Sequence, residues 1–157
     1  MTRIATLILA LLAIATGLTA CGGDDDGVTK KQFADKANAI CKSFTETLNT
    51  IGQGVDSADK GAAAMDKGVD AAKKALDDIN ALELPEGDTG ETAEEFQKGF
   101  EQDVNDVMIP AFEDARDAFK ENDIPGAQEA SERLQQLSEE NKSGKLASDL
   151  GATECAS

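Results

Sequence analysis

Apolar residues recur at steps of three and four positions along four stretches of this chain, and that period constrains its fold more than any other feature. A period near 3.6 places apolar side chains along one face of an α-helix. Trp and Tyr are absent, and no stretch alternates β-branched with polar residues as a half-buried strand would. The four stretches are 29–51, 57–79, 92–121 and 124–150. The pattern therefore predicts an all-α domain.

Short connections between these stretches favour an up-down-up-down four-helix bundle. Thr29 and Gln32 have the spacing of a capping box at the start of the first helix, and Ser57 is a suitable N-cap for the second. Thr92 opens a further capping box, Thr92-Ala93-Glu94-Glu95, so we expect the third helix to begin there. In such a bundle the fourth helix ends beside the start of the first.

Proline and glycine interrupt two of the helical stretches. Pro110 lies in the middle of the third stretch, where it removes one backbone hydrogen bond and should kink the helix. The alternative is a pair of helices broken at Ile109. Gly61 and Gly68 lie inside the second stretch, where each costs up to ~1 kcal/mol unless it lets a neighbour approach closely.

The first twenty residues have the layout of a secretory signal. One basic residue, Arg3, precedes an apolar segment over 4–18, which is shorter than the ~20 residues that a membrane-spanning helix needs. Leu18-Thr19-Ala20-Cys21 follows and resembles the bacterial lipobox. That resemblance implies transfer of a diacylglycerol to the Cys21 sulfur and cleavage before Cys21. The alternatives are an ordinary cleaved signal and an uncleaved N-terminal anchor.

This interpretation divides the chain into three parts. Residues 1–20 are the signal peptide, residues 21–28 form a flexible Gly- and Asp-rich tether, and residues 29–157 form the helical domain. Acyl chains such as palmitate on Cys21 would hold the protein to the outer face of the cell membrane, since each buried methylene contributes roughly 0.8 kcal/mol. We expect a monomer.

The cysteine count fits an exported protein. If lipid occupies Cys21, two cysteines remain, and an even number outside the cell predicts a Cys41–Cys155 disulfide. In the chain-entropy model, closing a loop of about 115 residues stabilises the fold by roughly 4–5 kcal/mol. The alternative is two free thiols packed in the core.

Three short motifs add a resemblance: Asn38-Ala39-Ile40-Cys41, Leu82-Glu83-Leu84-Pro85, and Leu150-Gly151 followed by Cys155. The mature region is similar to small, alanine-rich secreted lipoproteins of high-GC Gram-positive bacteria, which are largely uncharacterised. The resemblance implies a helical domain closed by the Cys41–Cys155 bridge, and it implies no activity. An aliphatic Leu150 stands where the resemblance places an aromatic residue.

Charge and composition exclude several functions. The chain has a formal net charge of −16 and no histidine. A polyanion is repelled by nucleic acid and anionic lipid, so we expect no nucleic-acid partner, whereas a cationic protein or envelope partner is allowed. The alternative is that the acidity only keeps an exported protein soluble. Without histidine, Ser-His and Cys-His nucleophiles and most zinc and di-iron sites are excluded. We expect no metal and no cofactor.

Carboxylates are the abundant reactive groups. Residues 29–51 hold four lysines and two acids, whereas residues 88–123 hold twelve acids and three bases. The third helix therefore carries an acidic face, and Asp103 borders its apolar stripe and is expected to be partly buried. This face would bind a cationic ligand, Ca²⁺ or Mg²⁺, or would be a solvated surface that pairs with lysines of the first helix. Its members are Glu94, Glu95, Glu101, Asp103, Asp106, Glu113, Asp114 and Asp117.

These features favour a membrane-tethered binding or structural module with no catalytic activity. One alternative is a carboxylate-dependent hydrolase of envelope polymers, which needs two acids held apart in a cleft with different pKa values. Another alternative is a small-molecule carrier, which needs an apolar cavity between the helices.

Overall fold

The computed structural model describes residues 27–140 and 142–156, so the signal-like segment, Cys21 and most of the tether lie outside the described residues. The described chain is helical, which confirms the all-α expectation, and its one extended pairing is an isolated bridge between Val28 and Pro85. The elements are α1 (Lys30–Ile51), α2 (Ala58–Asn80), α3 (Asp88–Gln102), the π-helix η1 (Asp103–Met108), α4 (Ile109–Glu121), α5 (Ile124–Glu140), α6 (Lys142–Leu150) and the 3₁₀-helix η2 (Thr153–Cys155).

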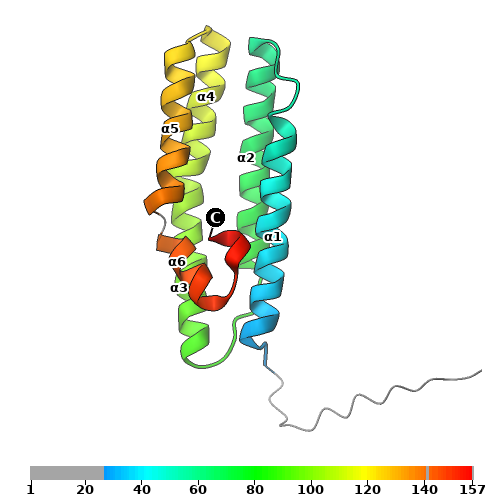
Figure 1. The fold of residues 1–157 in the computed structure, drawn as a ribbon, viewed down its shortest axis with the longest axis vertical. Coiled ribbons are helices and arrows are strands. Elements are labelled where there is room, and N and C mark those ends of the chain that lie inside the picture. The colour runs from blue at the N-terminus through cyan, green and yellow to red at the C-terminus, as the bar shows by residue number, and fades with distance from the viewer. Residues whose placement is uncertain (1–26, 141, 157) are drawn as a thin grey trace, which may run out of the picture.

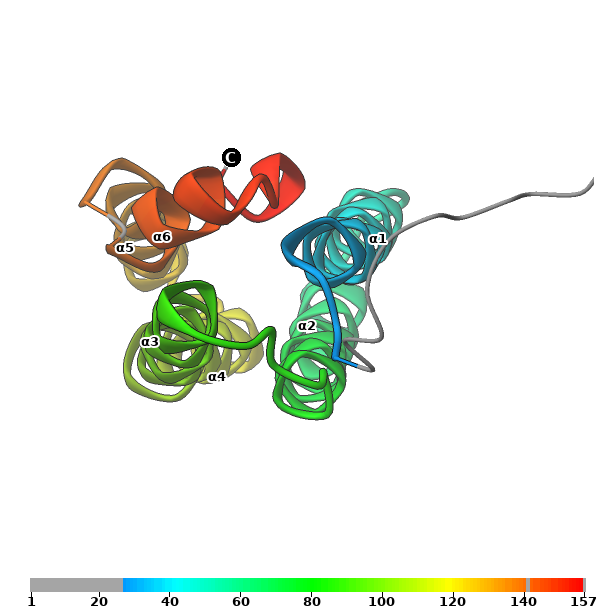
Figure 2. The same ribbon diagram turned by 90° about the horizontal axis from the view of Figure 1, so that it is seen from below.

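The helices lie along one long axis (Figure 1). α1 packs on α2, α2 on α4, and α4 on α5, while α6 packs on α3. The C-terminal segment then crosses from α6 to α1, so that η2 contacts both helices (Figure 2). α1 and α5 are not among the closely packed pairs of the described residues. No helix in the described ranges is long and apolar enough to cross a membrane.

Local sequence signals explain where several helices begin and end. The capping box of Thr29 and Gln32 forms as predicted, and the Ser57 hydroxyl accepts a hydrogen bond from the Lys60 N–H at the start of α2. At the other end of the chain, Gly151 adopts a φ of 87° just after α6. Because Gly151 is left-handed, the Ala152 N–H can donate a hydrogen bond to the Ala147 carbonyl oxygen, and the helix ends sharply there.

The predicted start of the third helix at Thr92 is wrong. α3 begins one turn earlier, at Asp88, after Gly87 turns the chain with a φ of 64°. Thr92 lies inside the helix, and its hydroxyl donates a hydrogen bond to the Asp88 carbonyl oxygen at 3.0 Å. The prediction failed because Gly87, with its positive φ, turns the chain directly into the helix. α3 therefore starts without a side-chain cap.

The chain remains helical from Asp88 through Glu121, past Pro110, rather than breaking at Ile109. The π-helix η1 lies directly before the proline, and the Ile109 N–H donates to the carbonyl of Val104, five residues back. Pro110 has no N–H to donate, so the interruption of the regular α-helical hydrogen-bond pattern falls at the same place as the π-helix.

Aromatic rings and alanines form the core. Phe33 meets Phe96 edge to face with ring centroids 6.2 Å apart, and Phe96 lies 6.0 Å from Phe100. The α2 glycines admit rings of α4: a Cβ placed at Gly61 would lie 2.6 Å from Phe119 Cδ1. This close approach explains why glycine is found within a helix, as the sequence analysis allowed.

Candidate functional site

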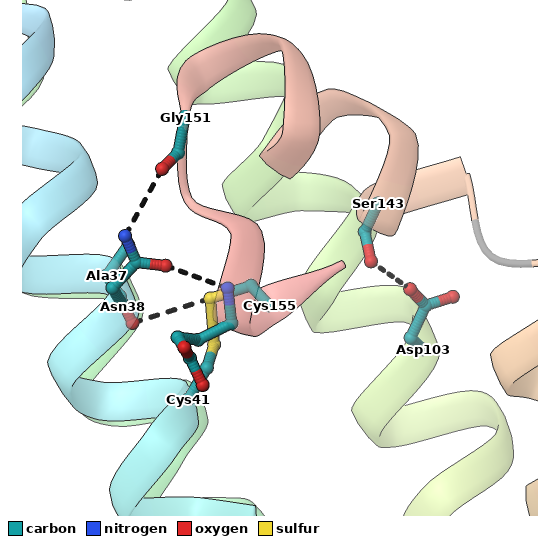
Figure 3. The surroundings of a disulfide bond; sticks show 8 residues. Ala37, Asn38, Cys41, Asp103, Ser143, Gly151 and Cys155 are labelled. Carbon is teal, nitrogen blue, oxygen red and sulfur yellow. Dashed lines mark hydrogen bonds between the residues drawn. A yellow bond between two sulfur atoms is a disulfide. The ribbon is translucent and has the colours of Figure 1, made fainter. Parts of the chain in front are cut away.

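The Cys41–Cys155 disulfide is present and anchors the C-terminal segment midway along α1, with the two Cα atoms 5.2 Å apart. Asn38, one turn before Cys41, strengthens this attachment (Figure 3). Its side-chain amide donates to the Gly151 carbonyl at 3.2 Å, and its side-chain oxygen accepts from the Glu154 N–H at 2.8 Å. Sequence reasoning missed this role, although Asn38 and Cys41 share one face of the helix.

A pocket of about 300 Å³ opens beside the disulfide. The C-terminal half of α1 forms one side, α5 contributes Leu134 opposite, and residues of α2, α3, η1 and α4 lie behind. The segment η2 lines one end, because the disulfide holds it against Cys41. The lining residues are Cys41, Phe44, Thr45, Leu48, Ile51, Gly52, Met65, Phe100, Met108, Phe112, Leu134, Glu154 and Cys155.

The pocket exists because the C-terminal segment spans only part of the distance between the two halves of the domain. η2 connects α6 to α1 at the level of Cys41, and beyond that point α1 has no close neighbour across from it in the described chain (Figures 1 and 2). Apolar side chains that a closed bundle would bury fully are left half-exposed there. They are Phe44, Leu48, Met65, Met108 and Leu134, all of which pack on the core.

The predicted acidic face is mainly a solvated surface. Glu94, Glu95, Glu101, Asp106, Asp114 and Asp117 are exposed, whereas Asp103 and Glu113 are half-buried. Three of these acids form ion pairs: Glu94 with Lys98 at 2.6 Å, Asp114 with Arg133 at 2.5 Å, and Asp117 with Arg116 at 2.8 Å. These partners lie on α3, α5 and α4, not on the first helix.

The hydrogen bond from Arg116 lowers the pKa of Asp117, and the hydrogen bond to Glu94 raises the pKa of Lys98. Both pairs are exposed, so each contributes little to stability. Among the residues that the structure describes, no cluster of three acids, cysteines or histidines has the geometry of a metal site.

Asp103 is partly buried, as expected, and its partner is a serine. The Ser143 hydroxyl of α6 is 1% exposed and donates to the Asp103 carboxylate at 2.5 Å (Figure 3). Burial raises the pKa of Asp103, and the hydrogen bond from Ser143 opposes that shift only in part. The pair joins η1 to α6.

Comparison of the chain with protein families, with curated proteins and with solved structures found no match. Any functional proposal for this chain therefore rests on its own sequence and geometry.

Proposed function

We propose that this protein is a non-catalytic binding module that takes up a small apolar molecule in the pocket between α1 and α5. The pocket is the observation that carries the proposal. Its volume of about 300 Å³ lies at the lower end of the range for small-molecule sites. Such sites are lined mainly by apolar and aromatic side chains with a few polar groups, and here the polar side chains are those of Thr45 and Glu154.

The energetics favour binding. A ligand would remove half-exposed apolar side chains from water, which contributes roughly 25 cal/mol for each Å² buried. Met65 and Met108 have flexible side chains that can adapt to a ligand's shape. The disulfide fixes η2 at one end, so little ordering is needed on binding.

We propose further that the module is a monomeric lipoprotein on the extracytoplasmic side of the cell membrane, anchored through lipid on Cys21. The signal-like residues 1–20, the lipobox resemblance and the Gly- and Asp-rich tether support this location. The resemblance to uncharacterised secreted lipoproteins of high-GC Gram-positive bacteria supports it as well.

We also propose that the helices constitute an up-down-up-down four-helix bundle. In this view α3, η1 and α4 together form its third member, and α5 and α6 form its fourth. A bend at Pro110 belongs to the same proposal, since a proline and a π-helical turn are both common causes of helix kinks.

A carboxylate-dependent hydrolase is less well supported by the geometry. Glu154 at the apolar pocket is exposed, and so are Asp88 and Asp149, which line another pocket near the start of α1. An acid that protonates a leaving group near neutral pH needs its pKa raised by burial.

The neutral apolar dye N-phenyl-1-naphthylamine, which fluoresces strongly in apolar surroundings, tests the binding proposal. The mature chain 21–157 carrying Cys21→Ala lacks both the apolar signal-like segment and the acyl chains, so it should need no detergent and no micelle competes for the dye. We expect saturable binding of one dye per chain, and we expect Leu48→Trp, which fills the pocket, to weaken it at least tenfold.

Leu76→Trp is the matched control, because Leu76 is also half-buried against the core but does not line this pocket. Thermal unfolding of both variants identifies any general loss of folding. Absence of saturable binding, or equal binding by the Leu48→Trp variant, would show that the pocket is not a binding site.

A further inference from the structure

We propose that the ligand of this pocket is a small aromatic molecule that carries no negative charge. This inference rests on the binding function proposed above and specifies the chemistry of the ligand. It is drawn from the types of side chain that line the pocket, from the way two of its rings are held, and from the charge around it.

The pocket gathers the sulfur-containing and aromatic side chains of the domain. Both methionines that follow Met1 line it, as do both cysteines of the disulfide. Three of the six phenylalanines line it too, whereas the remaining core is rich in alanine. A pocket for a saturated chain would need only aliphatic residues, so this composition favours a ligand that gains from rings and sulfur.

Two of the rings are held firmly from behind. Phe100 lies 6.0 Å from Phe96, which in turn contacts Phe33 edge to face in the core. Phe112 lies directly over Gly68, where an added Cβ would be 3.0 Å from the ring. Both rings are buried and present fixed apolar surfaces to the pocket. Fixed rings favour a flat aromatic ligand, which can meet them in offset or edge-to-face contact without further ordering.

The sulfurs supply the adaptable part of the wall. Met65 and Met108 are half-buried and line the pocket from α2 and η1. A thioether sulfur makes favourable contacts at the edge of an aromatic ring, and each such contact corresponds to about a two- to tenfold gain in affinity. A saturated molecule of the same size gains nothing comparable from sulfur.

Charge disfavours an anionic ligand such as a fatty acid. The titratable side chain among the described lining residues is Glu154, and the whole chain has a formal net charge of −16. A carboxylate on the ligand would be repelled by Glu154 and by the field of the protein. A neutral aromatic molecule meets no such penalty.

A matched pair of ligands tests this inference: aromatic 2-naphthol and its saturated counterpart, decahydro-2-naphthol. Both are neutral near pH 7 and carry one hydroxyl group. Their affinities are measured by displacement of N-phenyl-1-naphthylamine from the mature chain 21–157 carrying Cys21→Ala. In the variant Met65→Leu/Met108→Leu, which keeps apolar volume but removes both thioethers, we expect 2-naphthol affinity to fall at least about fourfold. The affinity of decahydro-2-naphthol should change less than twofold.

A gain-of-function variant and a charged ligand complete the design. Leu134→Met adds a sulfur to the opposite wall and should strengthen 2-naphthol binding about twofold or more. The anion 2-naphthoate should bind more weakly than 2-naphthol.

Three outcomes would contradict these expectations. If both neutral ligands bind but the Met65→Leu/Met108→Leu variant weakens both equally or neither, the aromatic preference is refuted while the binding function stands. If the dye and both ligands fail to bind, the binding function itself is refuted. Equal affinity for 2-naphthoate would overturn the charge requirement.

Discussion

Asp103 illustrates at the scale of one residue how burial and hydrogen bonding compete. Its carboxylate sits half-buried against α6, where loss of water outweighs the hydrogen bond from Ser143 and raises its pKa above the ordinary 3.8. An acid with a raised folded-state pKa binds its proton more tightly when folded. The stability that this group contributes is therefore greatest at low pH and falls as pH rises from 3.8 through the raised value.

Asp103→Asn should remove this pH dependence, because the amide oxygen still accepts from Ser143 but cannot ionise. We expect the free energy of unfolding of the variant minus that of wild type to be larger at about pH 7 than at about pH 4, so the variant is relatively more stable at the higher pH. Urea unfolding at the two pH values measures the difference. Asp106→Asn, an exposed site in the same π-helix, is the control and should show no such change. A variant whose relative stability is lower at pH 7 than at pH 4 would contradict the argument.

At the scale of the element, the packing of α2 on α4 depends on two glycines, Gly61 and Gly68. A Cβ at Gly61 would lie 2.6–2.8 Å from three ring atoms of Phe119. Gly61→Ala should therefore lower the free energy of unfolding by about 1–3 kcal/mol, despite alanine's higher helix propensity. Gly52→Ala, at the end of α1 where an added Cβ meets only one atom at 3.8 Å, should cost nothing. Thermal unfolding of both variants compares them; a neutral Gly61→Ala would mean that the half-exposed Phe119 ring swings aside.

Elements with local signals were predictable, and those set by tertiary packing were not. The starts of α1 and α2 follow from Thr29, Gln32 and Ser57, whose side chains bond backbone groups within one turn. The start of α3 did not, because a positive φ at Gly87 replaces a capping side chain. The π-helix before Pro110 changes the register of the apolar stripe, which no local motif encodes.

The candidate site was only partly visible in the sequence for the same reason. The cysteine count predicted the disulfide between Cys41 and Cys155, both of which are buried. The pocket beside it depends on the separation of α1 from α5, which is a property of the assembled domain. The apolar period predicts helices with one apolar face, but packing decides which side chains on that face stay half-exposed.

At the scale of the whole molecule, the disulfide joins the first helix of the domain to its C-terminal segment. It closes a loop with a sequence separation of 114 residues, which the chain-entropy model values at roughly 4–5 kcal/mol. The double variant Cys41→Ala/Cys155→Ala should lose about that much stability in urea unfolding. It should also lose dye binding, because η2 is no longer held at the end of the pocket. Wild type treated with reductant is the independent comparison; unchanged dye binding after full reduction would show that Asn38 alone holds the segment.

The position of the pocket along α1 bears on where the ligand comes from in the proposed anchored form. The tether joins the N-terminal end of α1, whereas the pocket lies along Cys41–Gly52, roughly 16–33 Å further along the helix at 1.5 Å per residue. This distance favours a ligand taken from the surrounding fluid over one extracted from the bilayer. A chain with an ordinary cleavable export signal in place of residues 1–20, together with Cys21→Ala, should then move from the membrane fraction to the medium while its dye affinity stays unchanged. Wild type in the same fractionation is the control. If the variant still sediments with membranes, the lipid anchor is refuted; if it is released but binds the dye with altered affinity, the lipid contributes to the pocket and the two parts of the molecule are not independent.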